Sequence, residues 1–315
     1  MEKVYILEDR GILYVNGPDT KSFLQNLISN DINKVTNINS CFASLLTPQG
    51  KYLYEFIITK HKEGYLLECE KKIINDLFKK LSSYKLRSKI EILNLSNEFV
   101  VAVISKDKFL SLKESKNIMG YTIKFREDPV YLDPRHADLG GRMITNLEKL
   151  HLSLKLLNLK SSEVREYYTL SSSLGIPQIN TNKLQNNIFG IECNLEELNG
   201  IDFKKGCYIG QENTARIKLK NKLLKRLFSI QIIKGNILGD NIINDNDIEV
   251  GKILIKDKFP FAVIKFKNKD FSFVKDVGKT FVNTYCEIIK DRMYLKHSNT
   301  EKNIQLEKRG RYVEF

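Results

Sequence analysis

The sequence predicts an α+β fold over most of the chain, followed by a β-rich C-terminal part. Strand-like and helix-like segments alternate irregularly in the first half, and leucines at helical spacing fill the middle. Short β-rich runs separated by polar residues fill the end. With 315 residues, 42% of them hydrophobic and 28% charged, the chain is long enough for two or three packed units and too apolar for a disordered protein.

The first elements are a strand and an amphipathic helix. Residues 11–15 form an apolar, strand-like run, and Gly17-Pro18-Asp19 follows it. Proline is favoured at the first helical position and an acid beside it suits the positive end of a helix, so we expect a helix to begin at Pro18. Its buried face would carry Phe23, Leu24, Leu27 and Ile28.

More strands and a second helix complete the first half. Residues 41–46 and 52–59 are predicted strands on either side of the turn signal Thr47-Pro48-Gln49-Gly50. An apolar stripe predicts a helix from about residue 71 to 84. The order of elements lacks the regular alternation of a doubly wound parallel sheet. The remaining predicted strands are 65–69, 89–95 and 99–104.

The second half is predicted to be helical and then β-rich. Leucines at helical spacing from residue 145 to about 173 predict one helical stretch, which ends at Gly175-Ile176-Pro177. We place the domain boundary near residues 225–235, with a first region at 1–228, expected to hold two subdomains, and a C-terminal domain at 229–315. That domain is expected to be a small antiparallel barrel or sandwich, with strands at 227–233, 250–255, 261–266 and 280–289.

Charge and cysteine content limit the function classes. Lys plus Arg minus Asp plus Glu is 51 − 38 = +13, a charge that favours acidic partners such as nucleic acid. The chain is also rich in Lys, Asn and Ile together, as an A/T-biased coding sequence would be, so the charge is weak evidence for nucleic acid. The five cysteines are scattered without a CxxC pair, which argues against a disulfide framework, a zinc site and an iron–sulfur cluster held by this chain alone.

The expected location is the cytoplasm. The first ten residues lack the apolar core of a signal peptide and the acid-poor character of a transit peptide. No apolar run approaches the length of about 18 residues that a membrane helix needs. Scattered cysteines fit a reducing compartment.

The most informative segment is residues 203–216, where Gly206 and Gly210 bracket Cys207-Tyr208-Ile209. Gly210 followed by Gln211-Glu212 is typical of a loop entering a helix. We expect Cys207 to lie before a positive helix end and beside lysines, where its thiol pKa would be lowered. The alternative is a half-buried cysteine in a tight turn whose glycines serve packing alone. A strip of nine Lys and Arg residues between 204 and 234 could bind a polyglutamate tail or RNA phosphates, or be a solvated face.

Residues 205–212, Lys-Gly-Cys-Tyr-Ile-Gly-Gln-Glu, with Thr214-Ala215-Arg216 after them, resemble the signature of the YgfZ-type folate-binding proteins. That family includes a bacterial protein linked to tRNA modification and mitochondrial iron–sulfur assembly factors of the Iba type. The eight-residue signature is highly specific. Weaker resemblances follow in the family's order at residues 17–31, 46–51, 133–142, 175–177 and 192–201.

The resemblance implies a fold and a function. The fold would be that of the glycine-cleavage T-protein (GcvT-like), with ferredoxin-like and α/β parts and a C-terminal antiparallel β-barrel. The function would be tetrahydrofolate binding and support for the assembly or repair of iron–sulfur clusters in client enzymes, including radical enzymes that thiolate tRNA. The implied partners are folate and iron–sulfur client or assembly proteins, with nucleic acid an open alternative and no membrane.

The resemblance also implies site residues. Cys207 would be the functional thiol, and a lone thiolate could ligate a cluster only together with a partner, so no metal site is expected. Glu192 would receive the pterin, and Arg216 would hold the carboxylate tail. Tyr208 would pack near the pterin or serve only the core. The folate-binding residues are thus expected to be Glu192, Lys205, Tyr208, Gln211 and Arg216.

Two other functions remain open at this point. T-protein relatives carry an acidic pair after a glycine-rich turn, whereas the comparable stretch here, from Gly50 to Tyr54-Glu55, lacks the first acid. Aminomethyl transfer is therefore not expected, and whether the protein is an enzyme stays open. The alternatives are a folate-dependent one-carbon transferase and an RNA-binding module that uses the basic strip.

Overall fold

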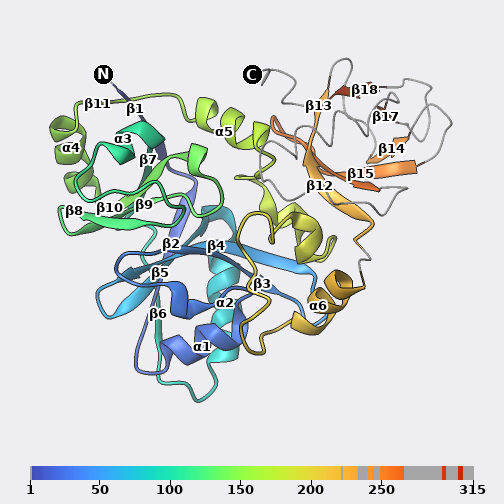
Figure 1. Ribbon diagram of the computed structural model, residues 1–315, viewed down its shortest axis with the longest axis horizontal. Helices are drawn as coiled ribbons and strands as arrows, with labels where there is room; N and C mark the ends of the chain where they lie inside the picture. The colour runs from blue at the N-terminus through green and yellow to red at the C-terminus, as the bar shows by residue number, and fades with distance from the viewer. Residues whose placement is uncertain are drawn as a thin grey trace.

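Three β-sheets meet around a shared core (Figure 1). The structure is a computed structural model of the chain and describes residues 2–220, 223–232, 240–243, 249–265, 293–295 and 304–307. The first sheet, with its two helices, occupies the lower part of Figure 1, the second lies at the upper left and the third at the upper right.

The first sheet has five antiparallel strands in the order β3-β4-β5-β2-β6. One face is covered by α1 and α2, whose apolar stripes bury Leu24 and Leu77 against the sheet. Apolar residues at helical spacing thus meet apolar residues at alternate strand positions. The elements are β2 (Arg10–Asn16), α1 (Thr20–Leu27), η1 (Ile32–Lys34), β3 (Cys41–Leu46), β4 (Tyr52–His61), β5 (Gly64–Glu70), η2 (Lys71–Ile73), α2 (Ile74–Lys85) and β6 (Glu91–Asn94).

The second sheet has six strands in the order β11-β1-β7-β10-β9-β8. Its only parallel pair among the described residues is β1 with β11. The outer face packs against short helices through residues such as Phe109 and Leu150. The elements are β1 (Glu2–Leu7), β7 (Val100–Ile104), α3 (Lys106–Leu110), β8 (Thr122–Phe125), β9 (Asp128–Leu132), η3 (Ala137–Leu139), β10 (Gly141–Thr145), α4 (Leu147–Leu156) and β11 (Leu159–Ser161).

A connecting region leads from these sheets to the third one. Its elements are α5 (Val164–Ser173), η4 (Thr181–Leu184), η5 (Gly190–Cys193) and α6 (Gln211–Leu219). The third sheet has the order β12-β16-β15-β14-β17-β18-β13. Its strands are β12 (Lys225–Ser229), β13 (Gln231–Ile232), β14 (Asn241–Ile243), β15 (Glu249–Ile255), β16 (Phe261–Lys265), β17 (Met293–Leu295) and β18 (Ile304–Glu307).

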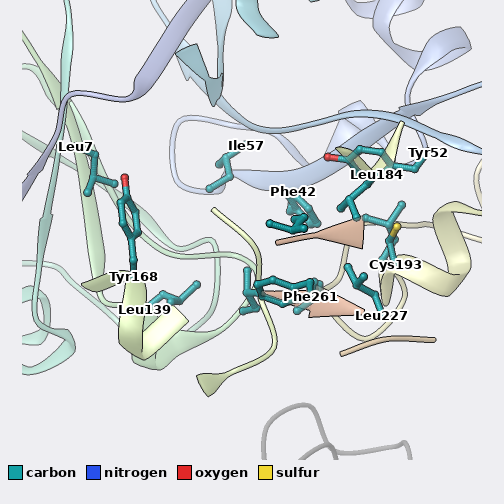
Figure 2. Packing of buried hydrophobic residues seen from close by; sticks show 14 of the residues in the cluster. Leu7, Phe42, Tyr52, Ile57, Leu139, Tyr168, Leu184, Cys193, Leu227 and Phe261 are labelled. Atoms are coloured by element: carbon teal, nitrogen blue, oxygen red, sulfur yellow. The ribbon is translucent and has the colours of Figure 1, made fainter. Parts of the chain in front are cut away.

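The largest core lies where the three sheets face one another (Figure 2). Leu7 and Ile57 come from the second and first sheets, and Leu227 and Phe261 come from the third. Leu184 and Cys193 of the connecting region pack among them. Burial of this apolar surface, the main stabilising term in folding, therefore joins all three sheets.

Most of the predicted elements in the first half are confirmed. Strands are found at the predicted runs 11–15, 41–46 and 52–59, and the helix predicted at 71–84 is η2 followed by α2. The α+β character is also confirmed, because nearly all strand pairs are antiparallel. The helix predicted to begin at Pro18 begins at Thr20 instead. Asp19 precedes it, and its carboxylate accepts a hydrogen bond from the backbone N of Lys89 at 2.7 Å rather than capping the helix.

The single helical stretch predicted from 145 to 173 is wrong. It is two helices, α4 and α5, with strand β11 between them. Asn158 has φ 52°, a left-handed conformation that ends the first helix, and residues 159–161 then pair with β1. The leucines do not form one buried stripe, because Leu147 and Leu156 of α4 are exposed. The stop at Gly175 is confirmed by its φ of 74° directly after α5.

The C-terminal part is a β-sheet, as predicted, but a closed barrel remains a prediction. Among the described residues, the strand order runs from β12 at one edge to β13 at the other without a pairing that joins the edges. The strand predicted at 280–289 lies outside the described residues. The boundary at 228/229 also remains a prediction, and β12 of the third sheet already begins at Lys225.

Candidate functional site

The signature segment is locked onto the β3–β4 turn by two glycines. Gly210 has φ 84°, and a Cβ at this position would meet the carbonyl oxygen of Thr47 at 2.5 Å. Gly50 in the turn has φ 80°, and its Cβ would meet the Gly210 oxygen at 3.2 Å. The two backbones approach so closely that glycine is required on both sides. Two motifs separated by 160 residues in the chain (210 − 50) are therefore one structural unit.

Lys205 anchors the same segment at its other side. Its ammonium donates hydrogen bonds to the carbonyl oxygens of Gln25 at 2.7 Å, Ile28 at 2.6 Å and Asn30 at 2.9 Å. These are carbonyls at and just after the C-terminal end of α1. The Lys205 side chain is buried, and burial lowers its pKa to about 8. An ammonium has three N–H donors, so this geometry leaves none for a ligand.

Cys207 lies between the two anchors and is exposed, whereas Cys41, Cys69 and Cys193 are buried. The neighbouring Gly206 is exposed too, and a Cβ there would meet no atom within 4 Å. The freedom of glycine is thus required at Gly210 but not at Gly206. The structure therefore separates the thiol from the core, against the alternative of a half-buried cysteine in a tightly packed turn.

The remaining predicted residues of the signature are divided between core and surface. The Tyr208 ring is buried under the Lys205 ammonium, which lies 5.0 Å from its centroid. Burial raises the pKa of Tyr208 to about 12, and its hydroxyl has no hydrogen-bond partner of standard geometry among the described residues. Gln211 begins α6 and is half-buried. Arg216 is exposed on α6 and donates a hydrogen bond to Asn213 Oδ1 at 2.5 Å.

Glu192 is buried in a segment that is hydrogen-bonded to the β3–β4 turn. It lies in η5, and its Oε2 accepts a hydrogen bond from the backbone N of Phe189 at 2.9 Å. Lys225 Nζ lies 3.8 Å from its Oε1. Burial raises the pKa of Glu192, opposed by this hydrogen bond and by the charge of Lys225. The backbone of Gly190 donates to the Gly50 oxygen at 3.0 Å, so the same turn carries Glu192 and the signature.

The structure adds a group of interior polar residues to those predicted. A β-bulge in β4 opposite Leu45 and Leu46 places Tyr52 and Glu55 on the same face of the strand. That face points into the core shared by the three sheets, whereas Tyr54 faces the helices. The only sequence signal for this was an acid within the otherwise apolar run Tyr52-Leu53-Tyr54-Glu55-Phe56. The bulge places two residues that are three apart in sequence on one face of the strand, and nothing in the sequence indicated it.

The interior polar group is electrostatically unusual. Burial raises the pKa of Glu55 to about 7, although the guanidinium groups of Arg135 and Arg10 oppose the shift. Burial also raises the pKa of Cys193, with the carboxyl of Glu55 as the next cause. The hydroxyl of Tyr52 is fully buried and interacts with the side chains of Glu55 and Thr181.

Two more polar residues, Gln178 and Glu70, extend this group. Gln178 accepts a hydrogen bond from Arg10 through its backbone oxygen at 3.3 Å, and its buried side-chain oxygen has no partner in the described part of the chain. Glu70 accepts hydrogen bonds from the backbone N atoms of Asn180 at 2.8 Å and Thr181 at 2.9 Å. The group therefore offers acceptors of both charged and neutral kinds.

A buried ion network lies beside the interior polar group. Glu68 accepts hydrogen bonds from Arg10 Nε at 2.8 Å and Arg142 Nε at 3.0 Å. Asp133 accepts from Arg135 Nη2 at 2.8 Å and Arg142 Nη1 at 3.2 Å. Burial alone would raise the pKa of Glu68, but Arg142 and Arg10 hold it far below its ordinary value. With three arginines facing two carboxylates, this network leaves one cation in excess.

The described residues contain neither a metal-binding cluster nor a membrane-spanning helix. No group of three or more His, Cys, Asp or Glu side chains in those residues could hold a metal ion. Within the same residues, no helix has the length and apolar character needed to cross a membrane.

Comparison with curated proteins finds iron–sulfur assembly factors. The chain is 28% identical over 251 residues to the mitochondrial iron–sulfur cluster assembly factor IBA57 homologue of Dictyostelium discoideum, covering 71% of this chain and 61% of that protein. It is 29% identical over 244 residues to mouse (Mus musculus) IBA57, covering 72% and 65%. It is 29% identical over 228 residues to the Neurospora crassa homologue, covering 70% and 52%. The chain thus spans between about half and two thirds of the length of these relatives.

Comparison with solved structures supports the fold. The crystal structure of the glycine cleavage system aminomethyltransferase T from Bartonella henselae matches with a TM-score of 0.70, covering 96% of this chain and 84% of that one at 10% identity. At that identity the likeness concerns the fold alone, and a mixed α/β fold of the T-protein type is confirmed. The similarities agree with a GcvT-like, Iba-type protein, while the YgfZ branch stays a prediction.

A third comparison concerns the C-terminal end. A family model described as coproporphyrinogen III oxidase matches residues 250–315. Because this match covers only a small share of the chain, it does not assign the chain to that family.

The expectation of a cytoplasmic protein is contradicted. The relatives from Dictyostelium, mouse and Neurospora are all named as mitochondrial proteins. Reduced, scattered cysteines fit any reducing compartment, so they could not separate the cytoplasm from the mitochondrial interior.

Proposed function

We propose that this protein is an accessory factor for the assembly or repair of iron–sulfur clusters in client proteins, and that it binds a reduced folate. The exposed thiol of Cys207, held between the Lys205 anchor and the Gly210 turn, carries the first part. The similarity to proteins named as iron–sulfur cluster assembly factors supports it. Since those relatives are named as mitochondrial, we infer a mitochondrial location.

The thiol is suited to act on a partner rather than within the core. Cys207 is exposed at a fixed position, and no other cysteine among the described residues shares its surface. One thiolate cannot hold a cluster, so any contact with iron or sulfur would be shared with ligands of a client or assembly protein. Tyr208 then has a structural role, because its buried ring packs against the Lys205 side chain of the same loop.

The folate part of the proposal rests on the interior polar group. A reduced pterin is planar and carries several N–H donors, which match the Glu55 carboxyl, the Tyr52 hydroxyl and the Gln178 side-chain oxygen as acceptors. Glu192 remains a further candidate acceptor. Gln211 and Arg216 are left to hold the carboxylate tail from α6, whereas the donors of Lys205 are already used.

The first test concerns Cys207. In cells that depend on this protein, Cys207→Ser should fold normally and lose most of the activity of iron–sulfur client enzymes, because a hydroxyl does not replace a thiolate toward iron or sulfur. Client activity, measured against client protein level, is the readout. Lys204→Ser, an exposed neighbour, is the matched control. Full client activity in the Cys207→Ser strain would remove the thiol from the proposal.

The second test concerns folate. Isothermal titration with tetrahydrofolate should give saturable binding, and Glu55→Gln should weaken it roughly tenfold, as loss of one charged hydrogen-bond acceptor does. Glu192→Gln and Arg216→Ala test the other two candidates in the same way. Glu63→Gln, at the exposed β4–β5 turn, should bind like the wild type. Absence of heat with the wild-type protein would contradict the folate proposal.

Finer parts of the proposal concern clients and chemistry. The clients are proposed to include radical enzymes that thiolate tRNA. Turnover of folate is not proposed, because the stretch from Gly50 to Tyr54-Glu55 lacks the first acid of the pair that T-protein relatives carry. Binding of tRNA by the basic strip would show a steep fall in affinity with salt. A tRNA titration at two salt concentrations distinguishes it from a role through protein partners.

A further inference from the structure

The signature lysine forms an unusual contact for a surface-loop residue. Lys205 is 8% exposed, and its ammonium lies among three backbone carbonyl oxygens at 2.6 to 2.9 Å. Among the described residues it has no carboxylate within ion-pair distance; the charges of Asp31 and Asp202 act on it from farther away. A buried charge without a counter-ion is costly unless every donor is satisfied, and here all three are.

Two of the three carbonyls belong to the end of α1: Gln25 lies in its last turn and Ile28 is its C-cap residue, whereas Asn30 follows the helix. The last carbonyls of an α-helix are left without intrahelical donors, and a cation there also interacts favourably with the helix dipole. α1 ends at Leu27, and no basic residue lies in its last turn. Lys205, 178 residues later in the chain (205 − 27), supplies the missing cap.

The segment is attached at further points on both sides of Cys207. Before it, the backbone N of Asp202 donates to the Ser29 oxygen at 3.0 Å, and Asp202 pairs with Lys34 at 2.8 Å. After it, Gly210 lies against the β3–β4 turn. The Tyr208 ring packs beneath the Lys205 ammonium. Between Lys205 and Gly210 only Gly206 and Cys207 are exposed.

We propose that Lys205 is a positioning residue: it fixes the Cys207 loop by capping the C-terminal end of α1. Without the ammonium, the carbonyls of Gln25, Ile28 and Asn30 lose their donor, and residues 203–209 lose three hydrogen bonds on that side. The thiol would then no longer be presented in one orientation. Only the use of that thiol rests on the proposed function; the anchoring does not.

The test compares two adjacent lysines in the full-length chain. Lys205→Met keeps the aliphatic length and removes the donors, and Lys204→Met is the matched control, since Lys204 is exposed. Backbone hydrogen exchange over residues 203–209 should become roughly tenfold faster in Lys205→Met, with the strands of the first sheet unchanged. Lys205→Arg, which keeps charge and donors, should restore much of the protection. Equal exchange in Lys205→Met and Lys204→Met would overturn the proposal.

A measurement on the wild-type protein covers the case in which Lys205→Met does not fold. Amine acetylation followed by peptide mapping should modify Lys205 roughly tenfold more slowly than Lys204, because the ammonium is buried and fully hydrogen-bonded. Equal rates for the two lysines would overturn the anchor. Client enzyme activity then separates this inference from the proposed function. A loosened loop with full client activity would contradict the role of the thiol and leave the anchor intact.

Discussion

Glu55 is a buried acid, and burial makes its ionised form unfavourable. It lies on a strand that is otherwise apolar, faces the core and has the guanidinium groups of Arg10 and Arg135 nearby. Its pKa is raised to about 7 by burial despite those cations, with Glu70 adding to the shift. The side chain can therefore exchange a proton near neutral pH, which suits a group that contacts a ligand in the interior.

The stability of the protein should report this proton. The folded pKa of Glu55, about 7, is above the ordinary value of 4.5, so the folded state holds a proton that the unfolded state releases between these values. The stabilisation is complete below pH 4.5 and is lost as the pH rises through about 7. Glu55→Gln should remove a slope worth on the order of 3 kcal/mol. Urea unfolding from pH 5 to 8 measures it, and an unchanged slope would contradict the assignment.

At the scale of elements, the β3–β4 turn and the start of α6 form one joint. Gly50 and Gly210 both have left-handed backbones. A Cβ at Gly50 would lie 3.2 Å from the Gly210 oxygen, and a Cβ at Gly210 would lie 3.0 Å from the Gly50 Cα. The turn also pairs with the segment that carries Glu192, through Gly190 to Gly50 and through Lys51 with Phe189. One short turn thus fixes the relative positions of Glu192 and the signature.

The two glycines around Cys207 should respond differently to alanine. Gly210→Ala forces a strained φ and a contact of 2.5 Å with a backbone oxygen. We expect it to lower the free energy of unfolding by about 2–3 kcal/mol. Gly206→Ala meets no atom within 4 Å and should change it by less than about 0.5 kcal/mol. Urea denaturation of both variants measures the free energy of unfolding. Equal losses in the two variants would mean that the close backbone contact at Gly210 does not stabilise the protein.

At the scale of the whole molecule, buried charges tie two sheets together across the common core. Arg10 and Glu68 belong to the first sheet, and Arg142 and Tyr131 belong to the second. Tyr131 and Arg142 both donate to the carboxylate of Glu68, and Arg142 also donates to Tyr167 of α5 at 2.6 Å. Apolar burial joins the sheets, and these directional bonds fix how they are aligned.

Removing the charge of Glu68 should therefore strongly destabilise the folded protein. Glu68→Gln leaves Arg10 without its carboxylate and Arg142 with Asp133 alone, and breaking a buried pair from one side costs about 3–5 kcal/mol. Thermal and urea unfolding provide the measurement. Glu166→Gln, which breaks the exposed pair with Lys3, is the control and should leave the urea midpoint unchanged. A Glu68→Gln variant as stable as this control would show that the network contributes little to the alignment of the sheets.

The sequence by itself determined the local elements and the signature. Apolar periodicity located α2 and the strands of the first sheet, because each is a local pattern of burial. The same periodicity failed at residues 145–173. There the edge strand β11, which pairs with β1, separates the helices α4 and α5. The exposed thiol of Cys207 was singled out by its neighbours in sequence alone.

Only the tertiary structure decided what each site residue does. Lys205 looked like a ligand-binding cation, and it is a cap for a helix 178 residues earlier in the chain (205 − 27). Tyr52 and Glu55 share a face only because a bulge shifts the strand register by one residue. Such roles depend on contacts between distant segments, and no local pattern encodes which carbonyl, turn or sheet a side chain will meet.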